Sequence, residues 1–283
     1  MNKAYFQLHV AVFLAGFTGI LGFLISLNGV VLTFYRLIIA VIFMVIIALW
    51  KRKKYSVKPH QKSKLIVIGI LLSLHWIAFY QSIKLANISV AVICLASTSC
   101  FTAIFSPIIQ KSKIYWQELV IGILGLIGMY IIFIKEPVFD KGIIVGTISA
   151  FLSSMLTIFS KKIAREIKPQ TQLFYEFIVG IIICFMVIVL WLITDFKNIQ
   201  PKELYPNFQD LIWITILSIV CTIILQQLLL TSLKRIKSFT VNLVFNLEIV
   251  YSIILAFIFF QEEKQLNEWF YFGAAIICAS III

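Results

Sequence analysis

Long apolar runs separated by short polar or charged segments make up most of the chain. Each run has about 20 residues, the length an α-helix needs to cross the hydrocarbon core of a bilayer. Polar residues do not recur at every second position, as they would in the strands of a membrane β-barrel. The pattern predicts ten membrane-spanning helices, at about 5–27, 31–50, 65–84, 88–110, 116–134, 142–164, 172–194, 211–233, 238–260 and 268–283.

Composition supports lipid as the surrounding solvent. Of the 283 residues, 61% are hydrophobic and 13% are charged, whereas soluble domains have roughly 45–50% apolar residues. A soluble fold would leave large apolar patches in water. We therefore predict an all-α integral membrane protein. The first run is interpreted as a retained helix, because no small-residue cleavage pattern follows it. The last run ends at Ile283 without a polar tail, which we interpret as a trimmed C-terminus.

The distribution of basic residues predicts the topology. The net charge of +12 is also compatible with a nucleic-acid-binding surface, but the charges lie in the loops between apolar runs. With the N-terminus inside, 17 Lys and Arg residues fall on the inner side and six on the outer side. This bias is typical of cytoplasmic loops. It predicts a multi-pass protein of the cytoplasmic (inner) membrane with both termini in the cytoplasm, membrane lipid as its surroundings and no nucleic-acid partner.

The two halves of the chain resemble each other. Residues 33–40 read TFYRLIIA and residues 173–180 read LFYEFIVG, at an offset of 140 residues, and 89–107 matches 238–256 at an offset of 149. Similar composition alone would also give a short match. We predict two five-helix repeats, 1–135 and 136–283. Because five is odd, the second repeat is inverted relative to the first, as in many secondary transporters.

Three charged residues lie inside predicted spans: Arg36, Glu176 and Glu248. A charge at mid-span costs at least about 2.5–3.5 kcal/mol on insertion scales, so each needs a partner or a wet cavity. Snorkelling or helix–helix bonding would account for Arg36 and Glu176 equally well. Glu248 lies too deep for its short side chain to reach water. These three are our candidates for recognising substrate charge or carrying a proton.

Polar and aromatic residues spaced three or four apart share faces of the third, fourth and ninth spans. The pairs are Trp76 with Tyr80, Thr98 with Thr102, and Glu248 with Tyr251, and Asn246 precedes the last pair. Together they predict a central pocket with aromatic walls and a few hydrogen-bonding groups. Ordinary helix packing and interfacial aromatic belts are the alternative for each residue alone. Near the inner end of the fourth span, Pro107 predicts a bend.

The residues of the common membrane enzymes are missing. All aspartates lie in loops, and the chain contains no HExxH, GxSxG or GxxxxGK[ST] motif. The cysteines show no CxxC spacing, so we expect neither a metal nor a cofactor. His75 lies inside a span, where a hydrogen-bonded packing role is favoured over proton transfer. The sequence therefore predicts a protein that is not an enzyme.

The stretch Leu233–Glu248 ahead of Gly273-Ala-Ala-Ile-Ile, with the repeat pair described above, resembles the EamA-type drug/metabolite transporter superfamily over essentially the whole chain. The resemblance implies a ten-helix cytoplasmic-membrane permease of two inverted repeats, usually an exporter of amino acids, other metabolites or toxic compounds. The family usually has Leu-Glu-Pro in the ninth helix, whereas Ile249 follows Glu248 here. A Gly-Glu pair usually closes the fourth helix of each repeat, and 111–113 and 261–263 take those places.

The sequence as a whole predicts a secondary transporter of small metabolites such as amino acids, working by alternating access through one cavity between the repeats. A proton or another coupling ion is a candidate partner, and an uncoupled facilitator fits equally well. A membrane scaffold or sensor with the same fold, which transports nothing, is the alternative.

Overall fold

A computed structural model of the chain describes residues 2–133, 140–195, 201–260 and 268–282. All regular structure within these ranges is helical, which confirms the all-α fold. Within the described ranges, nine helical segments are long and apolar enough to cross a membrane, and a shorter apolar helix covers Tyr271–Ser280. The predicted repeat boundary at 135/136 falls outside the described residues.

The helices follow the predicted segments closely. The first, second, third and fifth crossings are α1 (Asn2–Leu24), α2 (Gly29–Trp50), α3 (Pro59–Leu85) and α6 (Trp116–Phe133), and the fourth consists of α4 (Ile88–Cys94) and α5 (Ser97–Gln110). The second half has α7 (Asp140–Ile163), α8 (Pro169–Asp195), the short α9 (Pro201–Leu204), α10 (Phe208–Ser218), a π-helical turn η2 (Ile219–Ile224), α11 (Leu225–Leu233), α12 (Ser238–Phe245), α13 (Leu247–Phe260) and α14 (Glu268–Ile282).

The third crossing begins six residues earlier than the apolar pattern predicts, at Pro59 rather than residue 65. Proline is favoured in the first turn of a helix. The side-chain oxygen of Gln61 also accepts a hydrogen bond from the Lys58 amide at 2.9 Å. Capping chemistry, which hydropathy does not register, therefore adds polar turns before the apolar run.

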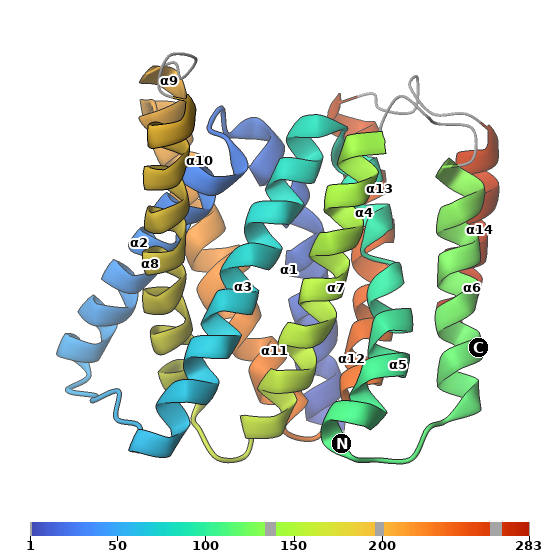
Figure 1. Cartoon of the computed structure of the whole chain (residues 1–283), viewed down its shortest axis with the longest axis horizontal. Helices are drawn as coiled ribbons and strands as arrows, with labels where there is room; N and C mark the ends of the chain where they lie inside the picture. Colours follow the sequence, from blue (N-terminus) through green and yellow to red (C-terminus); the bar gives the residue numbers. More distant parts are fainter. Residues whose placement is uncertain (1, 134–139, 196–200, 261–267, 283) are drawn as a thin grey trace.

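The two halves run in opposite directions through the bundle. Figure 1 shows α1 starting at the lower end, beside the N-terminus, and α7 starting at the upper end. In the described residues the first half crosses the bundle five times, and the second half crosses it four times before the shorter α14. The inverted arrangement therefore follows from the odd number of crossings in the first half. Below, "the N-terminal end" means the end of the bundle where α1 begins.

Both halves interrupt their fourth crossing at the same place. The first break lies at Leu95–Ala96, and the second lies at Asn246. At these breaks the backbone N–H bonds to the carbonyl three residues earlier, as in a 3₁₀-helix, instead of four residues earlier. Examples are Ala96 N to Ile93 O and Asn246 N to Leu243 O. Pro107 stays inside α5, so the interruption of the crossing is not where proline predicted a bend. The ninth crossing is also broken, although Ile249 replaces the family's proline.

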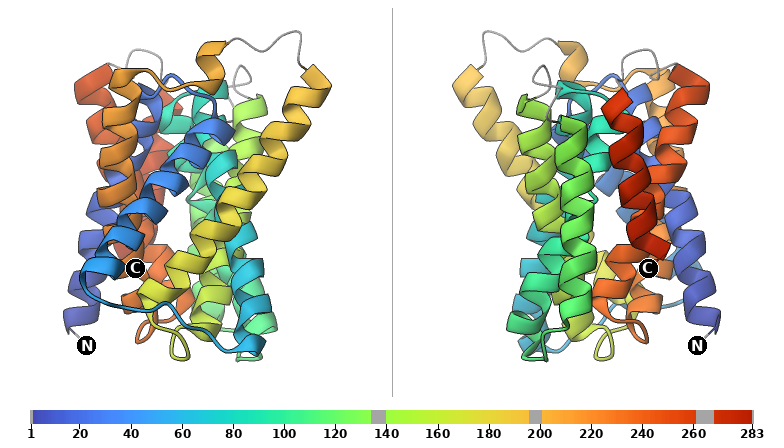
Figure 2. Two further views of the ribbon diagram at one scale, coloured as in Figure 1. Left: turned by 90° about the vertical axis from the view of Figure 1, so that its left-hand side faces the viewer. Right: turned by 90° about the vertical axis from the view of Figure 1, so that its right-hand side faces the viewer.

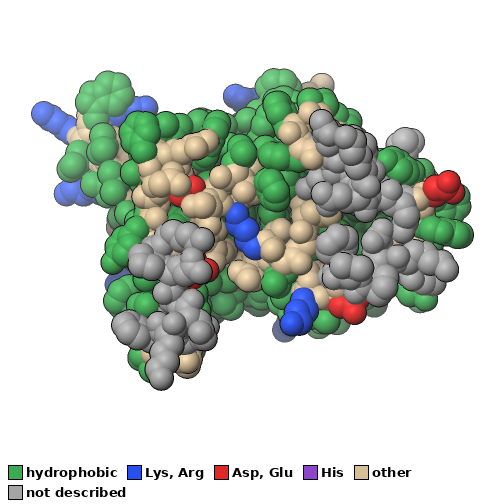
Figure 3. Space-filling model, turned by 90° about the horizontal axis from the view of Figure 1, so that it is seen from above, with side chains coloured by type: hydrophobic (Ala, Val, Ile, Leu, Met, Phe, Trp, Pro, Cys, Tyr) green, Lys and Arg blue, Asp and Glu red, His purple; other side chains and the backbone are tan. Residues whose placement is uncertain are grey.

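Peripheral helices pack through small residues. A Cβ atom placed on Gly273 of α14 would come within 2.4 Å of the Gly128 backbone oxygen of α6, so only glycine permits this approach. Figure 2 shows α6 and α14 side by side at one edge of the bundle. Viewed from the end opposite the N-terminus, the rim is mainly hydrophobic (Figure 3). An apolar rim is what a lipid-surrounded bundle requires.

Candidate functional site

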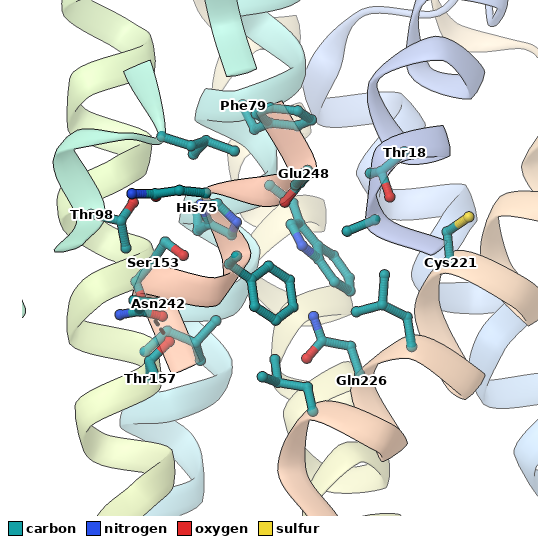
Figure 4. A pocket seen from close by; sticks show the side chains of 18 of the residues that line it. Thr18, His75, Phe79, Thr98, Ser153, Thr157, Cys221, Gln226, Asn242 and Glu248 are labelled. Atoms are coloured by element: carbon teal, nitrogen blue, oxygen red, sulfur yellow. Dashed lines mark hydrogen bonds between the residues drawn. The ribbon is translucent and has the colours of Figure 1, made fainter. Parts of the chain in front are cut away.

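A cavity lies in the middle of the bundle, between the two halves. Its walls come from α1, α2 and α3 of the first half, both broken crossings, and α7, η2 and α11 of the second. Its volume, taken as the space open to the centres of water molecules, is about 80 Å³. One water molecule needs roughly 10–15 Å³ of such space. Figure 4 shows the side chains of Glu248, His75 and Gln226 around this space.

Six of the ten residues predicted from sequence line the cavity, and four do not. The lining residues are Arg36, His75, Trp76, Thr98, Asn246 and Glu248. Tyr80, Thr102, Glu176 and Tyr251 lie outside the cavity wall.

Arg36 is only 1% exposed, and contacts with other helices hold its guanidinium group in place. Its Nε donates to Thr222 Oγ1 at 2.5 Å, one Nη donates to the Cys221 carbonyl at 2.8 Å, and the other donates to the Tyr80 hydroxyl. The guanidinium carbon lies 3.8 Å from the ring centroid of Trp76, a cation–π contact. Burial this deep excludes the snorkelling alternative. The helix-bonding alternative is realised, since Arg36 joins α2 to α3 and η2.

The π-helical turn explains how η2 binds this cation. A π-turn replaces the α-helical backbone bonds by bonds between residues five apart, and within this turn the Cys221 carbonyl accepts from Arg36. Thr222 Oγ1 donates to Leu217 O, five residues back, at 2.9 Å, which keeps its lone pair directed at Arg36. Three of the five guanidinium N–H groups are used in this way. Arg36 therefore lines the cavity as a fixed positive charge.

Glu248 faces the same cavity from the first turn of α13. It is 7% exposed. Among the described residues, neither Glu248 nor Arg36 takes part in an ion pair, and no hydrogen bond to the Glu248 carboxylate is found. Two opposite charges thus line one cavity without neutralising each other by direct contact. Such an arrangement is expensive in a membrane unless a ligand, an ion or water completes it.

Asn246 forms the break before α13 and is 2% exposed. Its Nδ2 has no hydrogen-bond partner in the part of the chain that the structure describes, and the residue lines the same cavity as Glu248. A buried amide without a partner costs about 1–3 kcal/mol. The Asn246 Nδ2 group at the cavity wall is therefore available to donate a hydrogen bond to a ligand.

His75 lines the cavity and is also held by α7. Its Nδ1 lies 3.0 Å from the Ser149 carbonyl and 2.9 Å from Ser149 Oγ. Ser149 Oγ in turn lies 3.0 Å from the His75 carbonyl. This double contact fits the hydrogen-bonded packing role favoured from sequence, and it presents the ring to the cavity at a fixed orientation.

Thr102 connects three helices behind the cavity wall. Its Oγ1 donates to Thr98 O at 2.7 Å, lies 2.9 Å from Ser154 Oγ of α7, and accepts from Asn242 Nδ2 of α12 at 2.6 Å. Thr98, one turn earlier, lines the cavity. The two threonines therefore have different roles: Thr98 lines the cavity, and Thr102 connects the first half to the second.

Glu176 holds the position in α8 that Arg36 holds in α2, but its surroundings differ. It is 2% exposed, and its carboxylate accepts from Gln172 Nε2 at 2.7 Å, one turn earlier on the same helix. The α8 backbone at Glu176 lies against Gly69 of α3. Among the described residues Glu176 has no cationic partner within ion-pair distance.

The two tyrosines act away from the cavity. Tyr80 is fully buried and binds Arg36, so it positions the cation. Tyr251 packs edge-on against Phe13 with ring centroids 5.7 Å apart, and its Cβ lies against Gly16 of α1. Glu248 and Tyr251 thus point to different neighbours despite their three-residue spacing.

Sequence reasoning missed several polar residues of the wall: Thr18, Ser153, Thr157, Gln226 and Asn242. Gln226 and Asn242 are amides within apolar spans, and this pattern could have identified them as candidates from the sequence. Hydroxyl residues are common in membrane helices, so the others carried no such signal. No cluster of three or more His, Cys, Asp or Glu residues suited to a metal occurs in the described part of the chain.

Comparisons with known proteins agree with this architecture. The model of a family described as the EamA-like transporter family matches residues 2–134 and 140–283. No curated protein matches. Among solved structures 27 chains match, and one of them, described only as a crystal structure of protein, is 13% identical. That alignment covers 99% of this chain and 96% of the other with a TM-score of 0.71, a likeness of fold.

Proposed function

Because the chain belongs to the EamA-like transporter family, we propose that it is a secondary permease that exports small metabolites such as amino acids by alternating access. A transporter family implies a small-molecule substrate and a lipid environment. The protein would carry its substrate unchanged, so no catalytic chemistry is proposed.

The observation that carries the proposal is the cavity between the inverted halves, lined by Arg36 and Glu248. Secondary transporters of this type bind substrate near the membrane midplane, beside interrupted helices. Here both interrupted crossings contribute, through Thr98 on one side and Asn246 on the other. Rocking of one half against the other would expose this site to each side in turn.

The two charges favour a substrate that carries both signs. Arg36 would bind a carboxylate through its remaining N–H groups, and Glu248 would bind an ammonium group. The aromatic rings of Trp76, Phe79 and Phe245 supply apolar walls for a side chain. An amino acid has this combination of groups. Proton coupling through Glu248 or His75 and uncoupled facilitation are both compatible with the same cavity.

Topology is proposed from the charges. The loops at the N-terminal end carry the basic residues Lys51–Lys54 and the cluster Lys234, Arg235 and Lys237. Positive loops remain in the cytoplasm. Both termini would then be cytoplasmic, in the inner membrane.

A counterflow assay tests the function. Purified protein in liposomes preloaded with one unlabelled amino acid should accumulate the same labelled amino acid, for at least one member of a panel. Everted vesicles then give the direction. The competing function, a scaffold or sensor, predicts neither counterflow nor ligand-dependent thermal stabilisation across the same panel.

Glu248→Gln provides the internal control for that assay. It should lower flux while leaving membrane insertion and the melting temperature unchanged. Equal flux in Glu248→Gln and wild-type vesicles would remove Glu248 from the proposed site, whereas no counterflow with any amino acid would remove the proposed substrate class.

A further inference from the structure

The short turn joining the first two crossings occurs once in each half, at opposite ends of the bundle. Helices α2 and α8 begin at Gly29 and Pro169, so the offset of 140 residues found in the sequence also relates the preceding turns. Ser26 in the first turn therefore corresponds to Glu166 in the second. Both residues contact the first two turns of the third crossing of the other half.

At the end opposite the N-terminus, Asp210 of α10 binds the turn before α2. Its Oδ1 accepts from the Ser26 amide at 2.8 Å, and its Oδ2 accepts from Ser26 Oγ at 2.6 Å. Asp210 is 2% exposed. Lys84 of α3 donates to the neighbouring Ile25 carbonyl. We call this set, Ser26, Asp210, Lys84 and Ile25, the Asp210 latch.

At the N-terminal end, Glu166 makes the corresponding contact with Lys64 of α3, at 3.1 Å. Arg165 Nε lies 3.3 Å from the Lys234 carbonyl. In the Asp210 latch the donor, Lys84, lies at the end of the third crossing and the acceptor, Ile25, in the turn. Here the donor lies in the turn and the acceptor at the end of the third crossing. We call this set, Glu166, Lys64, Arg165 and Lys234, the Glu166 latch. The equivalent turns before α2 and α8 thus each contact the start of the third crossing of the other half, one at each end of the bundle.

The two latches differ in strength. Side chains of Lys64 and Glu166 are 43% and 41% exposed, and exposed ion pairs contribute little to stability. A hollow between α3 and α7 lies directly beside them, with Val67 and Phe159 in its wall. The Asp210 side chain, in contrast, is buried, and its carboxylate accepts two hydrogen bonds from the exposed Ser26 and a third from the Asn207 amide at 3.2 Å. Hydrogen bonds to a charged acceptor are stronger than those between neutral groups.

We propose that these contacts are paired gate latches: the Asp210 latch is closed in this conformation, and the Glu166 latch tightens when the transporter exposes its cavity to the opposite side. The inference rests on the proposed alternating access. Because each latch joins one half to the other, a rocking motion that separates Ser26 from Asp210 brings Glu166 and Lys64 into closer, less exposed contact.

Hydrogen exchange of the full-length protein in lipid nanodiscs tests the pairing without a substrate. Asp210→Asn should accelerate amide exchange on the order of tenfold in residues 24–30, as expected when a hydrogen bond to a charged group is lost. Exchange in residues 59–66 and 163–168, at the other end, should slow. Glu166→Gln is the matched control and should shift both ends in the opposite sense by about twofold, because its ion pair is exposed.

Ser26→Ala guards against misfolding of the Asp210 variant, since it removes only one hydrogen bond of the latch. It should give the same reciprocal pattern in smaller degree, with unchanged exchange in α6. Faster exchange confined to 24–30, with no change at the other end, would overturn the proposal and leave a local turn contact. Reciprocal exchange in a protein without counterflow would instead retain the latches and remove the proposed transport.

Discussion

Arg36 and Glu176 hold equivalent positions in the two halves, yet only Arg36 lines the cavity. Arg36 has three hydrogen bonds to other helices and an aromatic ring over its plane, whereas Glu176 is bonded within its own helix. The repeat is therefore symmetric in topology and asymmetric in chemistry. The cavity forms between the two repeated halves, and their side chains there differ. Arg36 places a positive charge in the cavity wall, and the negative charge comes from Glu248 rather than from Glu176.

The largest effect is expected from removing the cation. Arg36→Ala should abolish counterflow and lower the free energy of unfolding by about 3 kcal/mol, because the Tyr80 hydroxyl, Thr222 hydroxyl and Cys221 carbonyl lose a charged partner. Chemical unfolding in detergent and counterflow measure the two losses. Arg36→Lys, which keeps the charge without the planar fork, should recover stability only in part. Wild-type stability and flux in Arg36→Ala would contradict the role given to this residue.

A comparison of the two carboxylates comes next. Glu248→Gln should reduce flux about tenfold or more, as expected for the loss of a charge contact with substrate. Glu176→Gln should keep flux within about twofold of wild type, because the amide preserves a hydrogen bond with Gln172. Both variants should insert normally. If Glu176→Gln were as damaging as Glu248→Gln, the asymmetry between the halves would have no functional meaning.

Asn246 should separate stability from function. Asn246→Leu removes a buried amide nitrogen without a partner, so we expect a gain of about 1 kcal/mol in unfolding free energy. Counterflow should nevertheless fall several-fold, because a donor in the cavity wall is lost. Parallel melting and flux measurements decide the matter, and a variant that is both more stable and fully active would show that the amide does not contact substrate.

The smallest effect is expected at Tyr251. Its ring packs against Phe13 and lies outside the cavity wall, and Tyr251→Phe preserves that contact. Initial counterflow rates should match the wild type within error. A substantial loss would mean that the hydroxyl reaches substrate in another conformation.

Hydropathy and charge were sufficient to predict the spans, their inverted order and the three intramembrane charges. They could not predict which of these charges faces the cavity. In uniformly apolar helices the rotation about the axis is determined by packing against neighbours rather than by an amphipathic pattern. For this reason the sequence predicts Glu176 and Tyr251 as site residues, although the Glu176 carboxylate is bonded to Gln172 within α8 and Tyr251 packs against α1.

The π-helical turn carried no sequence signal either. Ile219–Ile224 reads as an ordinary apolar helix, and its irregular hydrogen bonding becomes understandable only once Arg36, more than 180 residues earlier, is placed against the Cys221 carbonyl. The break at Asn246 was similarly hidden, because the proline that would have announced it is absent. At η2, therefore, the irregular backbone accompanies a long-range polar contact with Arg36, which the local sequence does not reveal.

The central claim, one cavity that opens to each side in turn, is tested most directly by labelling a single wall cysteine. Gln226→Cys, in a background with the five native cysteines replaced, places a thiol in the wall of the cavity that Glu248 also lines. Sealed vesicles of known orientation are treated with a membrane-impermeant maleimide from one side or the other. The account predicts labelling from both sides, with Asp210→Asn raising the rate from one side and lowering it from the other. Labelling from one side only, unaffected by that substitution, would contradict it.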